Sequence, residues 1–581
     1  MGSSSHRWPG PMAVEASQAE HPLIRRVRHS IIGDGEAIWG PYGARRMTYA
    51  DYSATGRAVS FIEDFIRDEV LPWYANTHTE SSGTGLRTTR LREDARQVVR
   101  EAVGGDDESV VIFTGSGATG AIDKLIGVLG LRLPAGLDDA YRLTEAIPPD
   151  ERPVVFIGPF EHHSNELPWR ETIADVVTIP EDRDGRISLA ALGEALRAYA
   201  GRPLRIGSFS AASNVTGIVT DTDAVSALLH SHGALAMWDF AAAAPHADVE
   251  MCGGGGDPRA YKDAVFISPH KFVGGPGTPG VLVVRRELLG NRVPAVPGGG
   301  TVDYVNPHEH HYVTDSVRRE EGGTPAIVES IRAGLVFGLK QAVGPSLIRE
   351  RERDFLRRAL ASWRADPDIE ILGNLDVERL SIVSFLARQP GGRYLHHNFV
   401  VTLLNDLFGI QARGGCSCAG PYGHRLLGID LDRSHRFERE ITAGCEGIKP
   451  GWVRIGFNYT LSEAEFRYIV QAVHMIAAHG WALLPEYRFD AQSALWRHKS
   501  GAAEPPPGLR EVRYDADGSL HYPRRHARLP EGALGGHLDE AEALFAAAGA
   551  GFHAAHRAEA HVSADFDELR WFELPAECLT A

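Results

Sequence analysis

The chain has 581 residues, of which 43% are hydrophobic and 23% are charged, a composition typical of a folded protein with two to four domains. Its formal net charge is −16 and its Lys and Arg residues are dispersed, so a nucleic-acid partner is not expected. The sequence contains no run of about 18 apolar residues, so a membrane span is not expected either. The first residues lack the apolar core of a secretory signal and five cysteines are too few for a disulfide framework, so we expect a cytoplasmic protein with reduced thiols.

Elements of the first half of the chain alternate between short apolar strands and helices. Residues 1–46 show no steady periodicity and are expected to form an N-terminal arm, and residues 58–71 carry a helical stripe of apolar residues. Strands are then expected at 109–115, 153–159, 204–211, 233–240, 263–269 and 280–286, with helices at 118–130 and 221–233. This alternation predicts a large α/β domain over 47–325, with a mostly parallel sheet covered by helices on both faces.

A second pattern begins after Gly323. Helical sequence is expected over 324–365, 394–409 and up to about 484, with strands at 380–387 and 451–459. These elements predict a smaller α+β domain over 326–484, followed by a C-terminal extension over 485–581. The one clear helix of the extension covers 537–549, and its Leu538, Ala541, Phe545 and Ala548 form an apolar face that can dock on the core.

Lys271 lies in the stretch "SPHKFVGGPGTPG", directly after the strand expected at 263–269. It is either an ordinary surface charge or a catalytic amine at the carboxyl end of a strand, where ligands bind in such sheets. Three other features favour the catalytic interpretation. Asp239 ends an apolar strand, and a buried carboxylate requires a cation or hydrogen-bond donors. A strand, a Gly-rich turn and a helix over 109–130 provide a site for an anion such as phosphate.

His162 follows another strand, and its imidazole is either structural or able to stack on a flat ring. A lysine for a Schiff base, a buried aspartate for a ring nitrogen, an anion-binding turn and a stacking histidine together describe a site for pyridoxal 5'-phosphate.

The ordered motifs "FTGSGAT", "EHHSN", "SNVTG", "WDFAAA", "SPHK", "EGGTP", "RGGCSCA" and "VRIGF" resemble those of class V pyridoxal-phosphate enzymes with fold type I. The resemblance covers roughly residues 45–480. It is strongest to cysteine desulfurases and selenocysteine lyases, and the N-terminal domain of molybdenum cofactor sulfurases is similar as well. It implies a homodimer, a small amino-acid substrate and a sulfur-acceptor protein.

The resemblance also implies residue roles. Lys271 would form the Schiff base, Asp239 would pair with the ring nitrogen, and His162 would stack on the ring. Asn214 would lie near the ring oxygen or the substrate, and Thr324 would reach the phosphate of the neighbouring subunit. The remaining phosphate contacts would come from Ala118, Thr119, Ser268 and His270. One position departs from the family pattern, because Ala242 stands where a glutamine donates a hydrogen bond to the ring oxygen.

Cys416 and Cys418 leave several interpretations open. With Cys445 and His424 they supply too few well-spaced ligands for a typical metal site, and a redox pair or a structural role is also conceivable. The family motif R-x-G-x-x-C-A falls on Arg413, Gly415, Cys418 and Ala419, which makes Cys418 the expected sulfur-accepting nucleophile.

Arg454 alternates with the apolar residues of its strand and matches the arginine that holds the substrate carboxylate, with Arg413 nearby. We therefore expect a cysteine desulfurase that removes sulfur or selenium from an amino acid through a persulfide. The alternative is a class V aminotransferase or another carbon–sulfur lyase in which Cys418 is not catalytic. Residues 421–450 are an insertion that either encloses the site or forms a partner surface.

Overall fold

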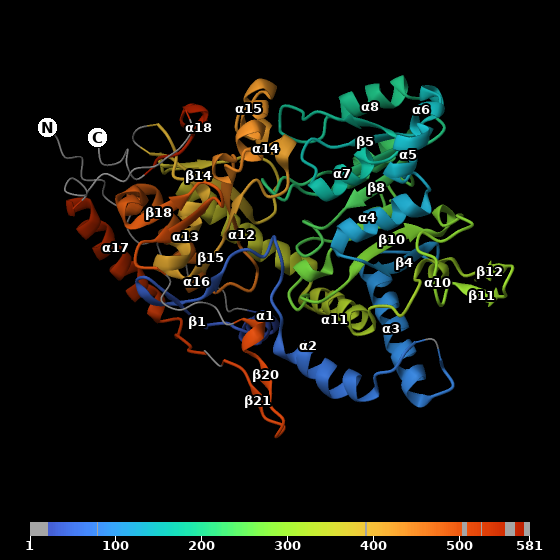
Figure 1. Ribbon diagram of the computed structural model, residues 1–581, viewed down its shortest axis with the longest axis horizontal. Coiled ribbons are helices and arrows are strands. Elements are labelled where there is room, and N and C mark those ends of the chain that lie inside the picture. Colours follow the sequence, from blue (N-terminus) through green and yellow to red (C-terminus); the bar gives the residue numbers. More distant parts are fainter. Residues whose placement is uncertain are drawn as a thin grey trace.

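A computed structural model describes residues 21–77, 79–389, 392–501, 508–523, 526–551 and 564–574. Within these residues the chain forms a seven-stranded and a four-stranded sheet, each packed against helices, with several two-stranded ribbons around them. In Figure 1 the seven-stranded sheet lies at the right, and the four-stranded sheet lies at the left beside the C-terminal elements. No helix in the described residues is long and apolar enough to cross a bilayer.

The seven-stranded sheet has the order β4-β10-β9-β8-β7-β5-β6. Strand β10 runs antiparallel to both of its neighbours, and the other pairs are parallel, which confirms the mostly parallel sheet that the sequence predicts. The strands are β4 (Ser109–Thr114), β5 (Val154–Ile157), β6 (Asp175–Thr178), β7 (Arg205–Ser210), β8 (Leu235–Asp239), β9 (Ala264–Ile267) and β10 (Gly280–Arg285).

Apolar residues on both faces of these strands explain why they form the centre of the molecule. Val111 and Phe113 of β4 belong to one core cluster, while Val110 and Ile112 belong to the cluster on the opposite face. Helix α4 (Gly117–Val128) covers the second face, and α3 (Gly83–Ala102), α8 (Leu189–Ala198), α9 (Thr222–Ser231) and α11 (Ile327–Val343) contribute to the first. Polar side chains, among them Asp239 at the end of β8 and Lys271 after β9, follow the carboxyl ends of the parallel strands.

The four-stranded sheet is antiparallel throughout, in the order β13-β14-β17-β16. Its strands are β13 (Ile369–Ile371), β14 (Ile382–Ala387), β16 (Arg413–Gly415) and β17 (Trp452–Gly456), and it packs with α12 (Pro345–Trp363), α13 (His397–Phe408) and α16 (Glu463–His479). Helix α13 ends at Gly409, whose φ of +65° is left-handed and suits glycine, as expected from the sequence.

The segment expected as an arm is structured over its described part. It holds α1 (Pro22–His29) and the hairpin of β1 (Ala37–Gly40) and β2 (Gly43–Arg46), while residues 1–20 lie outside the described residues. The helical stretch expected over 324–365 is two helices, because Gly344 adopts a φ of +93° between α11 and α12. The domain boundaries themselves remain a prediction.

The C-terminal extension packs on the helices of the four-stranded sheet. Helix α17 (Ala533–Gly551) contacts α16 and α13, and Ala541 and Phe545 are buried there with Leu538 and Ala548 beside them, which confirms the predicted docking face. The extension also contains β18 (Tyr487–Asp490), β19 (Leu495–His498), β20 (Arg513–Tyr514), β21 (Leu520–His521) and α18 (Ala564–Leu569).

The remaining elements are short connections. They are β3 (Thr48–Tyr49), β11 (Val302–Val305), β12 (His310–Tyr312), β15 (Ile410–Gln411), α2 (Ser60–Phe65), α5 (Ala135–Tyr141), α6 (Leu143–Ala146), α7 (Leu167–Arg170), α10 (Ser316–Glu320), α14 (Gly420–Leu426) and α15 (Leu431–Thr442). Helices α14 and α15 form most of the insertion over 421–450.

Candidate active site

A cavity of about 200 Å3 lies at the carboxyl ends of the strands of the large sheet, and β16 and β17 of the small sheet contribute to its wall. Eleven of the twelve predicted site residues line this one cavity. They are Ala118, Thr119, His162, Asn214, Asp239, Ser268, His270, Lys271, Arg413, Cys418 and Arg454. Thr324 is exposed and does not line it.

Lys271 ends a single 3-10 turn (Pro269–Lys271) directly after β9. Gly56 closes over this turn, since its N–H donates to the His270 carbonyl at 2.8 Å. A Cβ at position 56 would lie 1.8 Å from the carbonyl oxygen of Phe272, so only glycine fits there. Burial lowers the pKa of Lys271 to about 8, which brings the neutral, nucleophilic amine within reach near physiological pH.

Asp239 is the last residue of β8 and is 4% exposed. Its Oδ1 accepts a hydrogen bond from the Ala241 N–H at 2.8 Å. Burial raises the pKa of Asp239, although this hydrogen bond and the charge of Lys271 act in the opposite direction. No described residue forms an ion pair with the carboxylate, so it is suited to a cation brought by a ligand.

An anion cradle forms where β4 turns into α4. Gly117 has a φ of +56°, and a Cβ there would lie 2.7 Å from Ser268 Oγ, so the turn again requires glycine. The Ala118 N–H donates to Ser268 Oγ at 2.8 Å, Thr119 Oγ1 and Ser164 Oγ are 2.6 Å apart, and no side chain caps the helix at Ser116. Hydroxyl groups and the first N–H groups of a 12-residue helix thus face the cavity, an arrangement that favours phosphate.

The ring of His162 is held in place by hydrogen bonds at its Nδ1 atom. Its Nδ1 accepts the Ser164 N–H at 3.1 Å and lies 3.0 Å from Ser164 Oγ. Burial, reinforced by the charge of Lys271, lowers the pKa of His162 to about 3, and burial likewise lowers the pKa of His270 to about 4. Both rings are therefore neutral at physiological pH, and a neutral flat imidazole can stack on an aromatic ring.

Two arginines share one carboxylate at the other end of the cavity. Arg413 and Arg454 are opposite each other in the β16–β17 register, and Asp51 lies 3.1 Å from Arg454 Nη2 and 3.3 Å from Arg413 Nε. Arg454 is 3% exposed, and burial lowers its pKa in spite of Asp51. The Arg454 Nη1 donates to the Asn214 carbonyl at 3.1 Å, which fixes the guanidinium.

The Cys418 loop is tied to the large sheet by two side chains. Asn214 Nδ2 donates to the Ser417 carbonyl at 2.8 Å, and the ring Nε2 of His163 accepts the Gly420 N–H at 3.0 Å. The His163 N–H also donates to the Cys418 carbonyl at 2.8 Å. Cys418 is exposed and lines the cavity, whereas Cys416 packs against the core of the large sheet and does not line it.

In the residues that the structure describes, no group of three or more His, Cys, Asp or Glu side chains could hold a metal ion.

The donor set of the cavity fits pyridoxal phosphate. Four polar atoms of lining residues are buried without a hydrogen-bond partner among the described residues: Ser53 Oγ, Asn214 Oδ1, Ser417 Oγ and Arg454 Nε. Buried polar atoms normally have partners, so their common position around one cavity indicates a polar ligand. The cradle, the Asp239 carboxylate, which has no ion-pair partner among the described residues, and the buried amine of Lys271 match its phosphate, ring nitrogen and aldehyde.

Several residues of the site were not predicted from the sequence. Asp51 follows the short strand β3 and binds arginines about 360 and 400 positions away. Glu161 is 3% exposed and accepts hydrogen bonds from Gly158 N, Asn165 Nδ2 and both Ser210 N and Oγ, and burial raises its pKa to about 7. It lies directly before His162 in the motif "EHHSN", so its position was a signal that could have been used.

Comparisons with known proteins agree with this geometry. The aminotransferase class-V family model matches residues 48–465. A probable cysteine desulfurase of Streptomyces coelicolor is 27% identical over 418 residues, covering 71% of this chain and 90% of that protein. One of Halobacterium salinarum is 26% identical over 424 residues, covering 72% and 91%. The apo structure of the cysteine desulfurase of Thermococcus onnurineus superposes with a TM-score of 0.60 at 22% identity, covering 74% of this chain and 95% of that one, which bears on the fold.

Proposed function

The chain belongs to the aminotransferase class-V family of pyridoxal-phosphate enzymes with fold type I, and we propose that it is a cysteine desulfurase that takes sulfur from a small amino acid onto Cys418. The observation that carries the proposal is that Cys418 lines the same cavity as Lys271, Asp239 and Arg454. A thiol in that position faces the substrate carried by the cofactor. The curated relatives named probable cysteine desulfurases support the same activity.

The chain's own groups have distinct tasks in holding the cofactor. The cradle of Ala118, Thr119, Ser268 and His270 would hold the phosphate, Asp239 would keep a proton on the ring nitrogen, and Lys271 would hold the aldehyde carbon. The cofactor, when bound, supplies an electron sink that weakens bonds of the substrate next to its amino group. Neutral His162 would cover one face of the ring and keep water from it.

Arg454 would bind the substrate carboxylate. Its Nη atoms are engaged by Asn214 and Asp51, and its buried Nε has no partner among the described residues. This N–H is the donor that a carboxylate can take without breaking an existing contact, and Arg413 adds a second positive charge. Asp51 then acts as the group that orients both guanidinium groups.

Sulfur transfer follows from the position of Cys418. Its Sγ, as thiolate, attacks the substrate sulfur, so a sulfur–sulfur bond forms while the carbon–sulfur bond breaks. The electron pair of the broken bond stays with the carbon skeleton and becomes a carbon–hydrogen bond when Lys271 Nζ delivers a proton. The products are alanine and a persulfide on Cys418.

A second copy of the chain would complete the site. Thr324 is exposed outside its own cavity, and its Oγ1 accepts from Asn76 Nδ2 at 3.2 Å. Leu71, Trp73 and Tyr74, within five residues of Asn76, are each about half exposed (50%, 48% and 49%). Exposed large apolar side chains this close in sequence to Asn76, which contacts Thr324, support a homodimer in which they are covered and Thr324 reaches the partner's phosphate.

Delivery of the sulfur would require an acceptor. Because Cys418 is exposed, a sulfur-acceptor protein can approach it, and the insertion with α14 and α15 lies next to the loop in sequence. Cys252, Cys416, Cys418 and Cys445 are free thiols in the described residues, which supports a reducing compartment such as the cytoplasm.

The alternative is an aminotransferase or a β-eliminating lyase. Ala242 favours it, because this residue lines the cavity at the position of the expected glutamine and offers no hydrogen bond to the ring oxygen. Under that alternative Cys418 would not take part in the reaction.

Product analysis of three proteins separates these functions. Wild type, Cys418→Ser and Cys416→Ser are incubated with cysteine, and alanine, sulfide, pyruvate and other keto acids are quantified. A desulfurase loses alanine formation in Cys418→Ser and keeps most of it in Cys416→Ser, because Cys416 does not line the cavity. An unchanged rate of alanine formation in Cys418→Ser, or pyruvate as the main product, would contradict the desulfurase proposal.

A further inference from the structure

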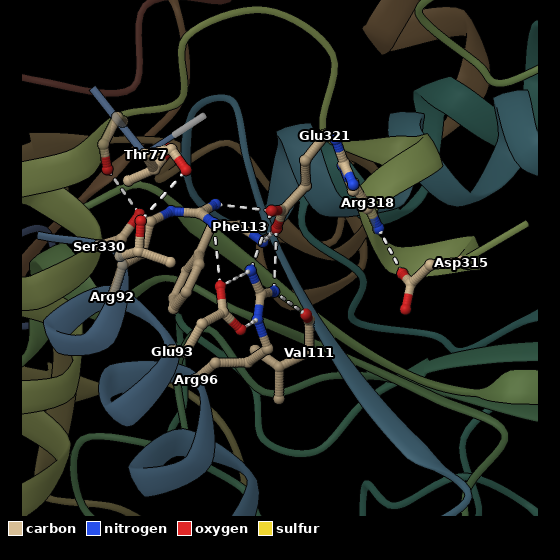
Figure 2. A network of polar contacts seen from close by, with 12 residues as sticks. Thr77, Arg92, Glu93, Arg96, Val111, Phe113, Asp315, Arg318, Glu321 and Ser330 are labelled. Atoms are coloured by element: carbon tan, nitrogen blue, oxygen red, sulfur yellow. Dashed lines mark hydrogen bonds and ion pairs between the residues drawn. The ribbon is translucent and has the colours of Figure 1, made fainter. Parts of the chain in front are cut away.

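A buried ion cluster lies outside the cavity, between α3, β4 and the loop after α10 (Figure 2). Its centre is Glu321, whose side chain is 7% exposed. Glu321 Oε2 lies 2.6 Å from Arg92 Nη2 and 2.9 Å from Arg96 Nη2, and Oε1 lies 3.0 Å from Arg96 Nη1. Nothing in the proposed reaction uses this cluster.

The two arginines are one helical turn apart on α3; Arg92 is buried and Arg96 is partly buried, with side chains 6% and 15% exposed. Both guanidinium groups lie over the ring of Phe113, at 5.5 and 5.2 Å from its centroid. Burial opposes ionisation of Glu321, but the charges of Arg96 and Arg92 lower its pKa overall, so it is a carboxylate. Breaking such a buried pair leaves an uncompensated charge, which makes the cluster rigid.

Glu321 also binds the backbone of the central sheet. Its Oε1 accepts the N–H of Phe113 at 2.8 Å, and Arg96 donates to the carbonyl of Val111. Phe113 is the penultimate residue of β4, and the cradle of Ala118 and Thr119 begins five residues later. The carboxylate therefore fixes the strand end from which the phosphate cradle starts.

The same residue anchors a second segment. Glu321 precedes Thr324 by three residues, and Thr324 lies outside its own cavity. The Glu321 side chain thus fixes the cradle of its own subunit by its hydrogen bond to Phe113. Because Glu321 is part of the loop that carries Thr324, the same contacts also fix that loop. The contacts of Glu321 therefore join the β4–α4 cradle, which would bind the phosphate of its own subunit, to the Thr324 loop, which would bind the phosphate of the partner subunit.

We propose that Glu321 is a positioning residue that serves both active sites of a dimer, the cradle in its own subunit and the Thr324 loop presented to the partner. The inference rests on the proposed function, since it requires a phosphate-bearing cofactor and a paired second copy. It assigns no chemical step to Glu321.

Hybrid dimers separate the two effects. Two differently tagged chains are co-expressed and purified through both tags, and one chain carries Lys271→Ala, so that only one site per dimer can be fixed by borohydride. The reference hybrid pairs wild type with Lys271→Ala. The first test hybrid pairs Glu321→Ala with Lys271→Ala, which alters the cradle of the reducible site. The second pairs wild type with Lys271→Ala/Glu321→Ala, which alters only the loop offered to it.

The measured quantity is the rate at which pyridoxal phosphate leaves during dialysis, followed by borohydride fixation and mass spectrometry of the Lys271 peptide. Both test hybrids are expected to release it about fivefold faster than the reference, or more. If the second hybrid matches the reference, Glu321 acts only within its subunit; if the first does, it acts only across the interface. Either outcome overturns the proposal.

Two further variants guard against a general loss of structure. Glu321→Gln keeps the shape and loses the charge, and it should show the same direction in both hybrids with the circular dichroism spectrum unchanged. Glu93→Ala is the matched control, because Glu93 contacts the same two arginines from an exposed position (2.9 Å to Arg96) but, among the described residues, forms no hydrogen bond or ion pair with β4 or the loop. The Glu93→Ala hybrids should match the reference, and a release rate as high as that of Glu321→Ala would overturn the proposal. A reference hybrid without reducible cofactor, or tags that never co-purify, would instead show that the proposed function or dimer has failed.

Discussion

The loop that carries the sulfur-accepting thiol is strained at two successive residues. Ser417 and Cys418 have φ values of +52° and +55°, a region that costs a residue with a side chain roughly 1–3 kcal/mol. Asn214 and His163 hold this conformation through the Ser417 carbonyl and the Gly420 N–H. The strained conformation persists because these two hydrogen bonds hold the loop in place. The same conformation places Cys418 at the cavity.

His163→Ala should therefore slow sulfur transfer without affecting the cofactor. Burial lowers the pKa of His163, so its ring is the neutral acceptor that the Gly420 N–H requires. Loss of this hydrogen bond costs about 1 kcal/mol, which corresponds to about a fivefold lower rate of alanine formation from cysteine. Cofactor content should equal that of wild type. His232→Ala, at the end of α9, is the control; an equal loss there, or full activity in His163→Ala, would contradict the role of the tether.

Residues that directly follow strands could be predicted at this scale, and those fixed by distant contacts could not. Lys271, Asp239 and His162 were visible because each follows an apolar run, and all three line the cavity. Asp51 was missed because its partners Arg413 and Arg454 become neighbours only through the β16–β17 register. The side-chain contact of His163 with Gly420 spans 257 positions and leaves no local signal.

At the scale of elements, periodicity identified the buried strands and the docking face of α17. Strand β6 was not predicted, because its residues are only partly buried and its sequence lacks a continuous apolar run. The hairpin β1–β2 was missed for a similar reason, since its pattern is mostly half-buried. The prediction of helix α17 was correct because its apolar residues repeat at helical spacing, and these residues pack on α16 and α13.

Phe545→Ala tests how much α17 contributes. Phe545 is 4% exposed within the core of the small sheet, and removing a buried phenylalanine side chain costs about 3–5 kcal/mol. The midpoint of urea unfolding monitored by tryptophan fluorescence should fall accordingly. Glu542→Ala, on the exposed side of the same helix, should change it little. A similar midpoint for both variants would mean that α17 does not stabilise the folded chain.

At the scale of the whole molecule, the active site and the C-terminal extension occupy different parts of the fold. The cavity lies where the large sheet meets β16 and β17. Helix α17 packs on α16 and α13 at the left of Figure 1, on the side away from the large sheet. The fold class followed from the alternation of strands and helices, but the extension's path did not, because its contacts are with elements distant in sequence. Trp496 Nε1, for example, donates to His396 Nδ1 at 3.1 Å across 100 positions.

Truncation after residue 490 should accordingly leave the cofactor site intact while destabilising the small sheet. Among the described residues, none beyond Arg454 lines the cavity, so pyridoxal phosphate should remain reducible onto Lys271 in the soluble truncated protein. The same truncation removes Trp496, Ala541, Phe545 and Phe572 from the small-sheet core and exposes the surface that they cover. The unfolding temperature should fall and self-association should increase, because a large apolar patch reaches solvent. Fixation of the cofactor, unfolding temperature and light scattering are measured on the same sample. Loss of the cofactor from a folded, monodisperse truncated protein would show that the extension completes the site.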